Sequence, residues 1–181
     1  DGIRSLIILP TRDLALQTAK FARNIGYFMD LSCALVIGGE SMENQFLAIL
    51  QNPDILIGTP GRILHVVTEM SLNLRKVDTI IIDEADRLYE MGFLDDLKKI
   101  MQLTAKEHQT MLVSATIPKT LINFSSLQMR APEFIRLDID IKLSEKLKLC
   151  NIYVKNEQKI GKFSQYNNLS YIDFFTQKYH H

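Results

Sequence analysis

Short apolar runs alternate with longer segments of helical period along most of this 181-residue chain, and this alternation limits the folds that it can adopt. Strands that alternate with helices predict a parallel sheet with helices on both faces. The run Thr79-Ile80-Ile81-Ile82-Asp83 is apolar at successive positions, as in a strand that is buried on both sides. We predict strands over residues 5–9, 33–37, 55–58, 79–83, 110–114 and 134–137, and helices over residues 13–28, 42–50, 60–69, 94–103 and 119–127.

Composition excludes several classes of protein. Hydrophobic residues make up 46% of the chain and charged residues 23%, a balance typical of one globular domain and not of a disordered chain. The 21 basic residues equal the 21 acidic residues in number, so any nucleic-acid site must be local. No apolar run approaches the 18 residues that span a bilayer. The two cysteines, Cys33 and Cys150, form neither a disulfide framework nor a metal knuckle, which fits a reducing, intracellular compartment.

The sequence pattern changes near residue 140. Residues 141–181 hold seven lysines and three acidic residues, and their periodicity is looser. A strand is still compatible with residues 147–154, whereas residues 156–170 fit a peripheral helix and a partly ordered tail equally well. We predict one domain over residues 1–140, followed by a linker, the first strand of a second domain and a polar tail over residues 141–181.

Three carboxylates stand at the end of the apolar run at residues 79–83. Asp83, Glu84 and Asp86 occupy four positions at the carboxyl end of a strand, where ligands bind in open α/β sheets. There Asp83 can hold a hydrated Mg²⁺ on a nucleotide phosphate, while Glu84 orients and deprotonates the attacking water. The alternative is an acidic first turn of a helix, a position that Asp and Glu favour.

Five motifs in a fixed order resemble the first RecA-like domain of the DEAD-box RNA helicases. They cover most of residues 1–140, and each lies at the end of a predicted strand. The motifs are Pro10-Thr11-Arg12-Asp13-Leu14-Ala15, Gly38-Gly39, Thr59-Pro60-Gly61-Arg62, Asp83-Glu84-Ala85-Asp86 with Arg87 and Met91-Gly92-Phe93 after it, and Ser114-Ala115-Thr116. The family usually has Glu where Asp13 stands, a difference that keeps the charge. The resemblance implies a RecA-like α/β fold, ATP and Mg²⁺ as cofactors, and RNA-dependent ATPase and helicase activity for the whole protein.

The resemblance also implies a role for each motif. Glu84 and Asp83 serve in ATP hydrolysis, with Asp83 holding the metal through water. Asp86 couples the state of the nucleotide to RNA handling through Ser114, Ala115 and Thr116. The residues that line the RNA path are Pro10, Thr11, Arg12, Gly38, Gly39, Thr59, Pro60, Gly61 and Arg62.

Ordinary physical chemistry agrees with these roles and also offers simpler readings. Arg12 and Arg62 lie just beyond strand ends, where a guanidinium and the N–H groups of a helix start can grip phosphate oxygens. Such contacts hold a backbone without reading bases. Alternatively, Arg12 pairs with Asp13 or another acidic residue, the Pro-Gly pair forms an ordinary turn, and Ser114 and Thr116 cap a helix.

Shorter strings resemble the ribosome-assembly branch of the same family, the nucleolar helicases of the large subunit. These strings also fit ordinary helices and strands. For the whole protein they imply a nuclear or nucleolar location and pre-ribosomal proteins as partners, beside RNA and a second RecA-like domain. The strings are Met42-Glu43-Asn44-Gln45-Phe46, Glu69-Met70-Ser71-Leu72, Ile135-Arg136-Leu137-Asp138 and Lys142-Leu143-Ser144-Glu145.

The sequence does not contain the phosphate-binding loop Gly-x-x-x-x-Gly-Lys-Ser/Thr of such an ATPase. Its Gly161-Lys162 pair is followed by Phe163, and Asn156 stands where the first Gly belongs. The family places this loop upstream of the position of Asp1, so we expect the natural protein to continue beyond its N-terminus. The His-Arg-x-Gly-Arg-x-x-Arg segment of the second domain is absent as well. We expect the chain by itself to hydrolyse little or no ATP.

The strand that carries the phosphate loop lies inside the sheet in the family. Its loss predicts a slot in the sheet and two exposed strand edges. We expect residues upstream of Asp1, another segment such as residues 168–175, or a neighbouring chain to fill the slot.

Two other functions remain open at this stage. The first is a non-catalytic RNA-binding or scaffold module that has lost its nucleotide site. The absent phosphate loop favours this function, whereas Glu84 opposes it, because a scaffold does not need that carboxylate. The second is a DNA-directed helicase of a related superfamily, which is disfavoured because the matching motifs are those of the RNA enzymes.

Overall fold

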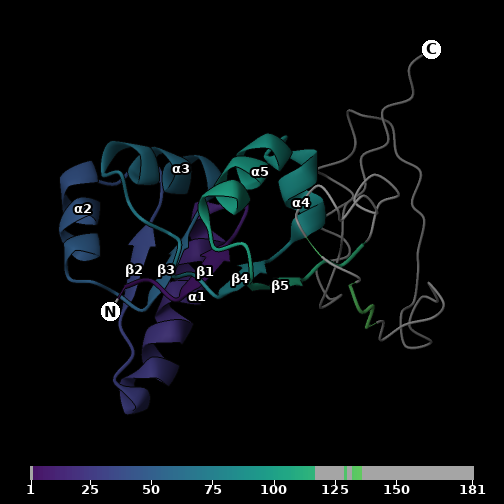
Figure 1. Ribbon diagram of the computed structural model, residues 1–181. Helices are drawn as coiled ribbons and strands as arrows, with labels where there is room; N and C mark the ends of the chain where they lie inside the picture. The colour runs from purple at the N-terminus through teal and green to yellow at the C-terminus, as the bar shows by residue number, and fades with distance from the viewer. Residues whose placement is uncertain (1, 117–128, 130–131, 136–181) are drawn as a thin grey trace, which may run out of the picture. The chain divides into compact units, whose positions relative to one another are not determined.

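Five parallel strands organise the computed structural model, in which residues 2–116, 129 and 132–135 are described (Figure 1). Their order across the sheet is β2-β3-β1-β4-β5. Every pair of neighbours is parallel, so the five carboxyl ends lie at the same edge. This confirms the parallel sheet and its first five strands. The strands are β1 (Ser5–Ile8), β2 (Cys33–Val36), β3 (Ile55–Gly58), β4 (Thr79–Ile82) and β5 (Gln109–Leu112).

The helices agree closely with the periodicity of the sequence. The predictions over residues 42–50, 60–69 and 94–103 are confirmed, and the one over residues 13–28 is observed as α1 followed by one 3₁₀ turn. The six-residue α4 was not predicted, because it is too short to show helical periodicity. The helices are α1 (Arg12–Gly26), the 3₁₀ turn η1 (Tyr27–Met29), α2 (Met42–Leu50), α3 (Pro60–Glu69), α4 (Ala85–Glu90) and α5 (Leu94–Leu103).

Several predictions fall on other parts of the chain. The helix over residues 119–127, the domain boundary at residue 140 and the whole of residues 141–181 lie outside the described residues. Of the strand predicted over residues 134–137, only Phe134 and Ile135 are described, and neither lies in a strand.

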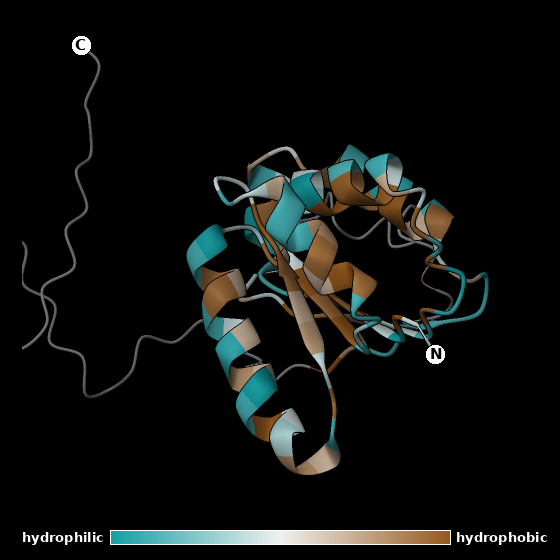
Figure 2. Cartoon of the chain, turned by 90° about the vertical axis from the view of Figure 1, so that its left-hand side faces the viewer, coloured by the Kyte–Doolittle hydropathy of each residue, from teal (hydrophilic) through white to brown (hydrophobic). Residues whose placement is uncertain are grey.

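Hydrophobic clusters cover the two faces of the sheet, because alternate side chains of each strand point to opposite sides. On one face, strand residues such as Leu6 and Ile80 pack with Ile63 of α3 and Ile100 of α5. Figure 2 shows the hydrophobic strands with α1 on one side and the other helices on the opposite side. None of the helices in the described part of the chain is long and apolar enough to cross a bilayer.

Among the described residues, α1 covers only part of its face of the sheet. The alanines of α1, Ala15 and Ala19, pack with Leu9, Ile37 and Ile57, so the helix approaches β2 and β3 closely. On the same face, β5 leaves Met111 40% exposed, next to the half-buried Ile81 of β4.

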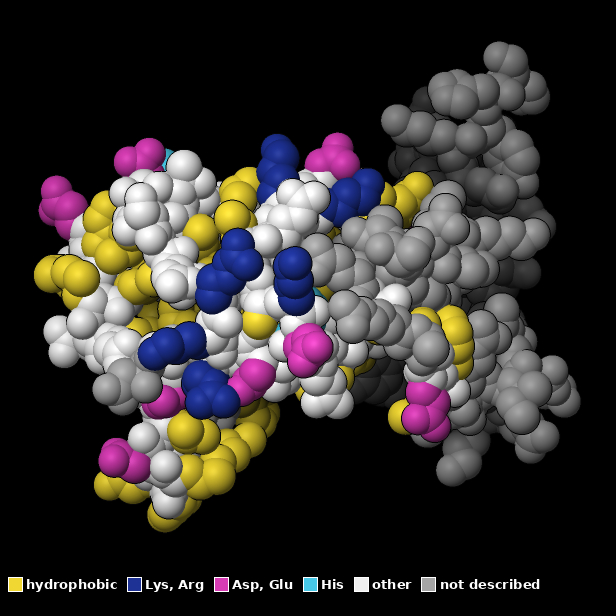
Figure 3. Space-filling view, in the orientation of Figure 1, with side chains coloured by type: hydrophobic (Ala, Val, Ile, Leu, Met, Phe, Trp, Pro, Cys, Tyr) yellow, Lys and Arg dark blue, Asp and Glu magenta, His cyan; other side chains and the backbone are white. Residues whose placement is uncertain are grey.

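The end of α1 exposes a second group of hydrophobic side chains. Phe21 and Ile25 are 62% and 63% exposed, and Phe28 of η1 is 88% exposed. Tyr27 packs edge-on against Phe28, with ring centroids 5.4 Å apart. Figure 3 shows hydrophobic side chains gathered over this end of α1, whereas Lys and Arg side chains lie near the middle of the same view.

The predicted slot does not interrupt the described strands. β1 pairs with β3 and β4, and β4 pairs with β5, so the ladder is continuous. The structure therefore corrects the expectation of a gap between these strands, since the exposed region lies at β5 and on one face instead. Residues 168–175, the segment expected to fill the slot, lie outside the described residues.

Hydrogen bonds tie the amino ends of the strands together in one row. The Arg4 N–H donates to the Asp54 carbonyl (2.8 Å), and the Asp78 N–H donates to the Arg4 carbonyl (3.0 Å). The Gln109 N–H then donates to the Asp78 carbonyl (2.8 Å), and the Asp54 N–H donates to the Ser32 carbonyl (3.0 Å). The row includes the start of every strand and therefore fixes the register of the strands. The register in turn sets where the loops begin at the opposite edge.

Side chains reinforce the same row. The Ser32 N–H and hydroxyl donate to the Asp54 carboxylate at 2.8 and 2.9 Å, which lowers the pKa of Asp54. The Arg4 guanidinium hydrogen-bonds the Asp78 carboxylate and lowers the pKa of Asp78. Both acidic residues are therefore ionised at neutral pH, although the exposure of the ion pair between Arg4 and Asp78 limits its contribution to stability.

We predict that Gly58→Ala destabilises the chain by about 2 kcal/mol, because overpacking a strand contact forces the backbone apart. A Cβ at this position would overlap the Val36 backbone and lie 3.0 Å from the Val36 carbonyl carbon. Urea unfolding at pH 7 measures the loss. Gly61→Ala is the matched control for stability, since its Cβ would meet only the Asp96 carboxylate at 3.9 Å. Equal unfolding midpoints for the two variants would contradict the close approach of β2 and β3.

Candidate functional site

The five motifs occupy the loops that follow the five strands. Parallel pairing brings these loops to the carboxyl edge of the sheet, where open α/β sheets bind their ligands. The contacts described below form two groups. One group joins the loops after β4 and β5, and the other joins the loops after β1, β2 and β3.

The carboxylates after β4 sit in a sharp turn. The Asp83 N–H continues the ladder by donating to the Ile8 carbonyl (3.0 Å), and the Asp83 carboxylate accepts the Glu84 N–H (2.9 Å). Glu84 has φ 47° and ψ 52°, in the left-handed region that non-glycine residues rarely adopt. Such backbone strain is concentrated at functional sites. The turn connects β4 to α4 through two residues, Asp83 and Glu84, and leaves both half-buried at the edge.

Asp86 is the centre of the hydrogen bonds between the loops after β4 and β5. Its side chain is largely buried, and the residue is 8% exposed. One carboxylate oxygen, Oδ2, accepts the Thr116 N–H (3.2 Å) and the Thr116 hydroxyl (2.8 Å), while Oδ1 accepts the Arg87 N–H (3.0 Å). The Asp86 N–H donates to the Ser114 hydroxyl (3.2 Å), which in turn donates to the Thr116 carbonyl. Ala115 lies between these two residues and is exposed.

Two opposing effects determine the charge of Asp86. Burial raises the pKa of the carboxyl group, because it penalises the charged form. Hydrogen bonds with the Thr116 and Ser114 side chains and with the Arg87 and Thr116 backbone outweigh burial and hold the pKa below its ordinary value of 3.8. Asp86 is therefore an anion at neutral pH, and its partners are oriented as donors.

Arg12 is held against the loop after β2. Thr11 caps α1 by accepting the Leu14 N–H (3.4 Å), and Arg12 is the first residue of that helix. Its guanidinium lies over Gly39, so that a Cβ on Gly39 would be 2.7 Å from Arg12 Cζ. The acidic partner of Arg12 is Glu40, at 3.9 Å, and not Asp13. Both side chains of this pair are more than half exposed, so the pair is weak and the guanidinium stays accessible.

Arg62 lies in the first turn of α3 and contacts the Met42 thioether at the start of α2. Thr59 occupies the N-cap position of α3, but its hydroxyl does not cap the helix, unlike that of Thr11. Pro60 is buried at the first helical position, while Gly61 is exposed. The half-buried Thr59 hydroxyl is thus available for a ligand, whereas Pro60 shapes the loop.

The other residues predicted to line the RNA path are of two kinds: some are buried and shape the loops, and others are accessible to a ligand. Pro10 is buried, Gly38 is half-buried and Gly39 is exposed. Gly39 has φ +79°, which favours glycine, and the space above it is taken by Arg12. Glu40 and Gln45 complete this region, although neither residue has a role predicted from the sequence. The available signal was the polar Gln45 on the buried face of α2, which is otherwise apolar.

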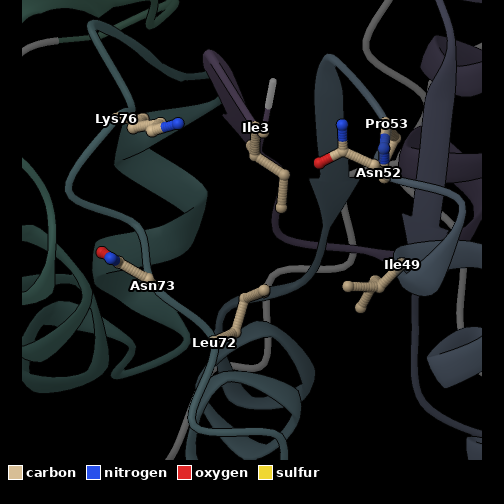
Figure 4. A pocket seen from close by; sticks show the side chains of 8 residues that line it. Ile3, Ile49, Asn52, Pro53, Leu72, Asn73 and Lys76 are labelled. Carbon is tan, nitrogen blue, oxygen red and sulfur yellow. The ribbon is translucent and has the colours of Figure 1, made fainter.

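A separate pocket lies at the opposite edge of the sheet. Its volume is about 260 Å³, and Figure 4 shows Ile3, Ile49 and Leu72 directed into it. The other lining residues are Gly2, Asn52, Pro53, Asn73 and Lys76. The lining contains no carboxylate, histidine or cysteine, and its residues precede strands β1, β3 and β4. The pocket is therefore distinct from the edge that carries the motifs.

We predict that Asp86→Ala lowers the free energy of unfolding at pH 7 by about 1–3 kcal/mol, since it removes a buried carboxylate and leaves the part-buried donors of Thr116 and Arg87 unpaired. The folded pKa of Asp86 is lowered, so the ionised group stabilises the fold above the unfolded pKa of about 4. This contribution is lost as the pH falls through the folded pKa. The stability gap between wild type and variant should therefore shrink below about pH 4. Urea unfolding from pH 7 to pH 2 measures this gap.

Asp95→Ala is the control for the pH series. The Asp95 side chain is 84% exposed and pairs only with Lys98, at 3.5 Å. The difference in free energy of unfolding between Asp95→Ala and the wild type should stay small from pH 7 to pH 2. A gap for Asp86→Ala that stays constant from pH 7 to pH 2 would contradict the role of the charged carboxylate.

Comparison with known proteins places this geometry in a family. Residues 1–124 match the DEAD/DEAH box helicase family. The ATP-dependent RNA helicase DDX54 of Mus musculus is 49% identical over 158 residues, which cover 87% of this chain and 18% of the relative. The ATP-dependent RNA helicase dbp10 of Aspergillus clavatus is 44% identical over 160 residues, covering 88% of this chain and 17% of the relative. The chain thus spans about a fifth of the length of these curated relatives.

Solved structures agree with the sequence comparison. A hypothetical ATP-dependent RNA helicase from Sulfolobus tokodaii superposes with a TM-score of 0.67 at 39% identity, over 73% of this chain and 40% of that chain. A DEAD box protein from Methanococcus jannaschii gives a TM-score of 0.67 at 38% identity, over 71% and 35%. These likenesses confirm the RecA-like sheet predicted from the motifs. On its motifs, its sheet and its sequence, the chain belongs to the DEAD/DEAH box helicase family, in the DEAD-box branch.

Proposed function

We propose that the protein to which this chain belongs is an RNA-dependent ATPase that clamps an RNA backbone and uses ATP hydrolysis to remodel or unwind it locally. The observation that carries the proposal is the hydrogen-bond network of Asp86 with Ser114 and Thr116. It links the carboxylate turn after β4 to the next strand end, at the same edge as the two arginines. Membership of an ATP-dependent helicase family supports nucleotide use.

Asp83 and Glu84 divide the hydrolytic work in this proposal. Asp83 provides a hard carboxylate oxygen at the strand end, and such oxygens are the ligands that Mg²⁺ prefers. The described residues contain no group of three or more His, Cys, Asp or Glu that could hold a metal ion. One carboxylate is nevertheless enough here, because Mg²⁺ keeps several waters and takes substrate phosphates as ligands. When bound, the ion neutralises charge on the phosphates, and Asp83 would hold it through water.

Glu84 acts next to Asp83 as the general base. A carboxylate in this position orients the attacking water and accepts its proton. The sequence contains no phosphate-binding loop, and we therefore propose that this chain by itself hydrolyses little or no ATP.

The three loops after β1, β2 and β3 form the RNA side of the site in this proposal. The accessible Arg12 guanidinium, the Arg62 guanidinium, the Thr59 hydroxyl and the exposed Gly39 suit contacts with phosphate and sugar. None of these groups requires a particular base. We therefore propose binding with little sequence preference.

The network at Asp86 is the proposed coupling device. Thr116 and Ser114 can keep their hydrogen bonds only while the turn after β4 and the loop after β5 hold their relative positions. A change at the nucleotide therefore reaches the neighbouring loop through Asp86. We further propose a second RecA-like domain as the other half of the clamp, with the linker to that domain and its first strand within residues 141–181.

We also propose a biological process and a cellular location for the protein. The strings around Gln45 and Met70, which resemble the ribosome-assembly branch of the family, support a role in ribosome assembly, with pre-ribosomal proteins as further partners. A nuclear or nucleolar location follows from that role.

Glu84→Gln in the full-length protein tests the hydrolytic assignment. We expect RNA-stimulated ATP turnover to fall at least about 100-fold, because the amide cannot accept the proton of the attacking water. RNA and ATP affinity should be kept. Turnover is measured with and without single-stranded RNA.

Glu90→Gln is the matched control, since Glu90 is an exposed residue of α4 that pairs with Arg87 at 2.9 Å. It should turn over ATP like the wild type. A wild-type protein that binds RNA but hydrolyses no ATP would contradict the ATPase and favour the scaffold function.

Binding to RNA and DNA strands of equal sequence tests the ligand class. We expect RNA to bind more tightly, because the 2′-hydroxyl offers an additional donor and acceptor to the loops. Several RNA sequences should bind with similar affinity. Fluorescence anisotropy with labelled strands measures both comparisons, and tighter binding of DNA would support the DNA-directed helicase instead.

A further inference from the structure

Gln45 is one of three buried polar or charged residues in the described part of the chain, together with Asp86 and Thr104. It lies in the middle of α2 and is 5% exposed. Burying an amide without hydrogen bonds costs free energy, so a buried glutamine is retained only where both of its polar atoms are paired.

Both ends of the Gln45 amide bind the backbone of one residue. The side-chain carbonyl accepts the Ile37 N–H (3.2 Å), and the side-chain NH₂ donates to the Ile37 carbonyl (2.9 Å). Ile37 is the first residue after β2, and the adjacent β3 ends at Gly58. The Val36 carbonyl accepts the Thr59 N–H on the side of β3. The amide of Gln45 therefore pairs with the next residue on the opposite side of β2, which is the edge strand among the described strands.

The residue that Gln45 holds leads directly into the loop under Arg12. Gly38 and Gly39 follow Ile37, and the Arg12 guanidinium lies over Gly39. Glu40, the next residue, forms the ion pair with Arg12. A shift in the end of β2 would therefore move the surface on which the Arg12 guanidinium rests.

The other end of the loop is closed by α2 itself. The Ser41 hydroxyl caps the helix by accepting the Asn44 N–H (3.4 Å), and the Gln45 N–H donates to the Ser41 carbonyl (3.3 Å). Met42, the first residue of α2, contacts Arg62. Residues 37–45 thus form a closed loop that touches both arginines.

We propose that Gln45 is a positioning residue for the RNA-binding edge: its amide holds the closed loop of residues 37–45 and thereby sets where Arg12 and Arg62 meet the RNA backbone. This inference rests on the proposed function of the edge. Gln45 is buried, so it acts through the loop and touches no RNA itself.

Gln45→Leu in the full-length protein tests the proposal. Leucine keeps most of the volume but leaves the Ile37 N–H and carbonyl unpaired. We expect affinity for single-stranded RNA to fall about tenfold, while the affinity for ATP stays unchanged. Gln17→Leu is the matched control, since Gln17 is an exposed residue of α1, and it should bind RNA like the wild type.

The salt dependence of RNA binding separates positioning from a general loss of stability. Each phosphate contact contributes about 0.7 to the slope of log affinity against log salt for a single strand. Arg12→Ala should lower this slope by one contact, and Gln45→Leu should lower it by at least one contact, because the loop touches both arginines. The double variant should bind no more weakly than Gln45→Leu alone, because that variant has already lost the Arg12 contact.

The outcomes distinguish the two proposals. Arg12→Ala that binds RNA like the wild type would overturn the RNA site, and the positioning role with it. Weaker binding by Arg12→Ala together with normal binding by Gln45→Leu would overturn the positioning role alone. Equal losses of RNA and ATP affinity in Gln45→Leu would assign Gln45 to general stability and also overturn it.

Gln45→Glu keeps the test decisive if the leucine variant does not fold. Glutamate retains the acceptor for the Ile37 N–H but loses the donor to the Ile37 carbonyl, so RNA affinity and salt slope should lie below those of the wild type. Binding indistinguishable from the wild type would contradict the proposal.

Discussion

The parallel pairing of β1 with β3 on one side and β4 on the other is the constraint on which the rest of the structure depends. Ser5 is level with Ile55 and Thr79, so the three strands end at the same height. The hydrogen-bonded row at their amino ends keeps this register. As a result, the loops that begin near Pro10 and Thr59 and the turn at Asp83 emerge at one edge of the sheet. Backbone pairing alone thus gathers the candidate site.

Pairing of the backbone stops where the strands end, and two buried polar side chains continue it. Asp86 joins the turn after β4 to the loop after β5, and Gln45 joins the end of β2 to α2. If the partners of either residue moved away, the fold would lose free energy of stabilisation, because a buried amide or carboxylate would be left without hydrogen bonds. Hydrophobic contacts, which are not directional, would tolerate such movements better. The two side chains therefore give the loops defined positions that apolar packing alone would not impose.

The two faces of the sheet differ in how completely the described residues cover them. Helices α2, α3 and α5 pack against the larger hydrophobic cluster, whereas α1 covers only the part of the other face near β2 and β3. Met111 and Phe21 remain exposed on or beside the less covered face. The hydrogen-bonded ladder of strands is continuous, so the partial cover of this face does not interrupt the carboxyl edge of the sheet. The contacts of Asp86 and Arg12 can form for the same reason.

Periodicity and local motifs determined much of this protein. The alternation of runs predicted the parallel sheet, and the acidic turn at Asp83 was placed correctly because the end of a parallel strand is predictable from sequence. Other features depend on partners that are distant in sequence and close in space. The partner of Arg12 is Glu40 and not the adjacent Asp13, because the loop after β2 folds back over the start of α1. The hydrogen bonds of Gln45 to Ile37, the left-handed backbone of Glu84 and the continuous ladder at β5 were likewise decided by tertiary structure. Sequence patterns report which residues are apolar and which spacing they follow, whereas directional contacts between loops exist only once the sheet has set the distances between them.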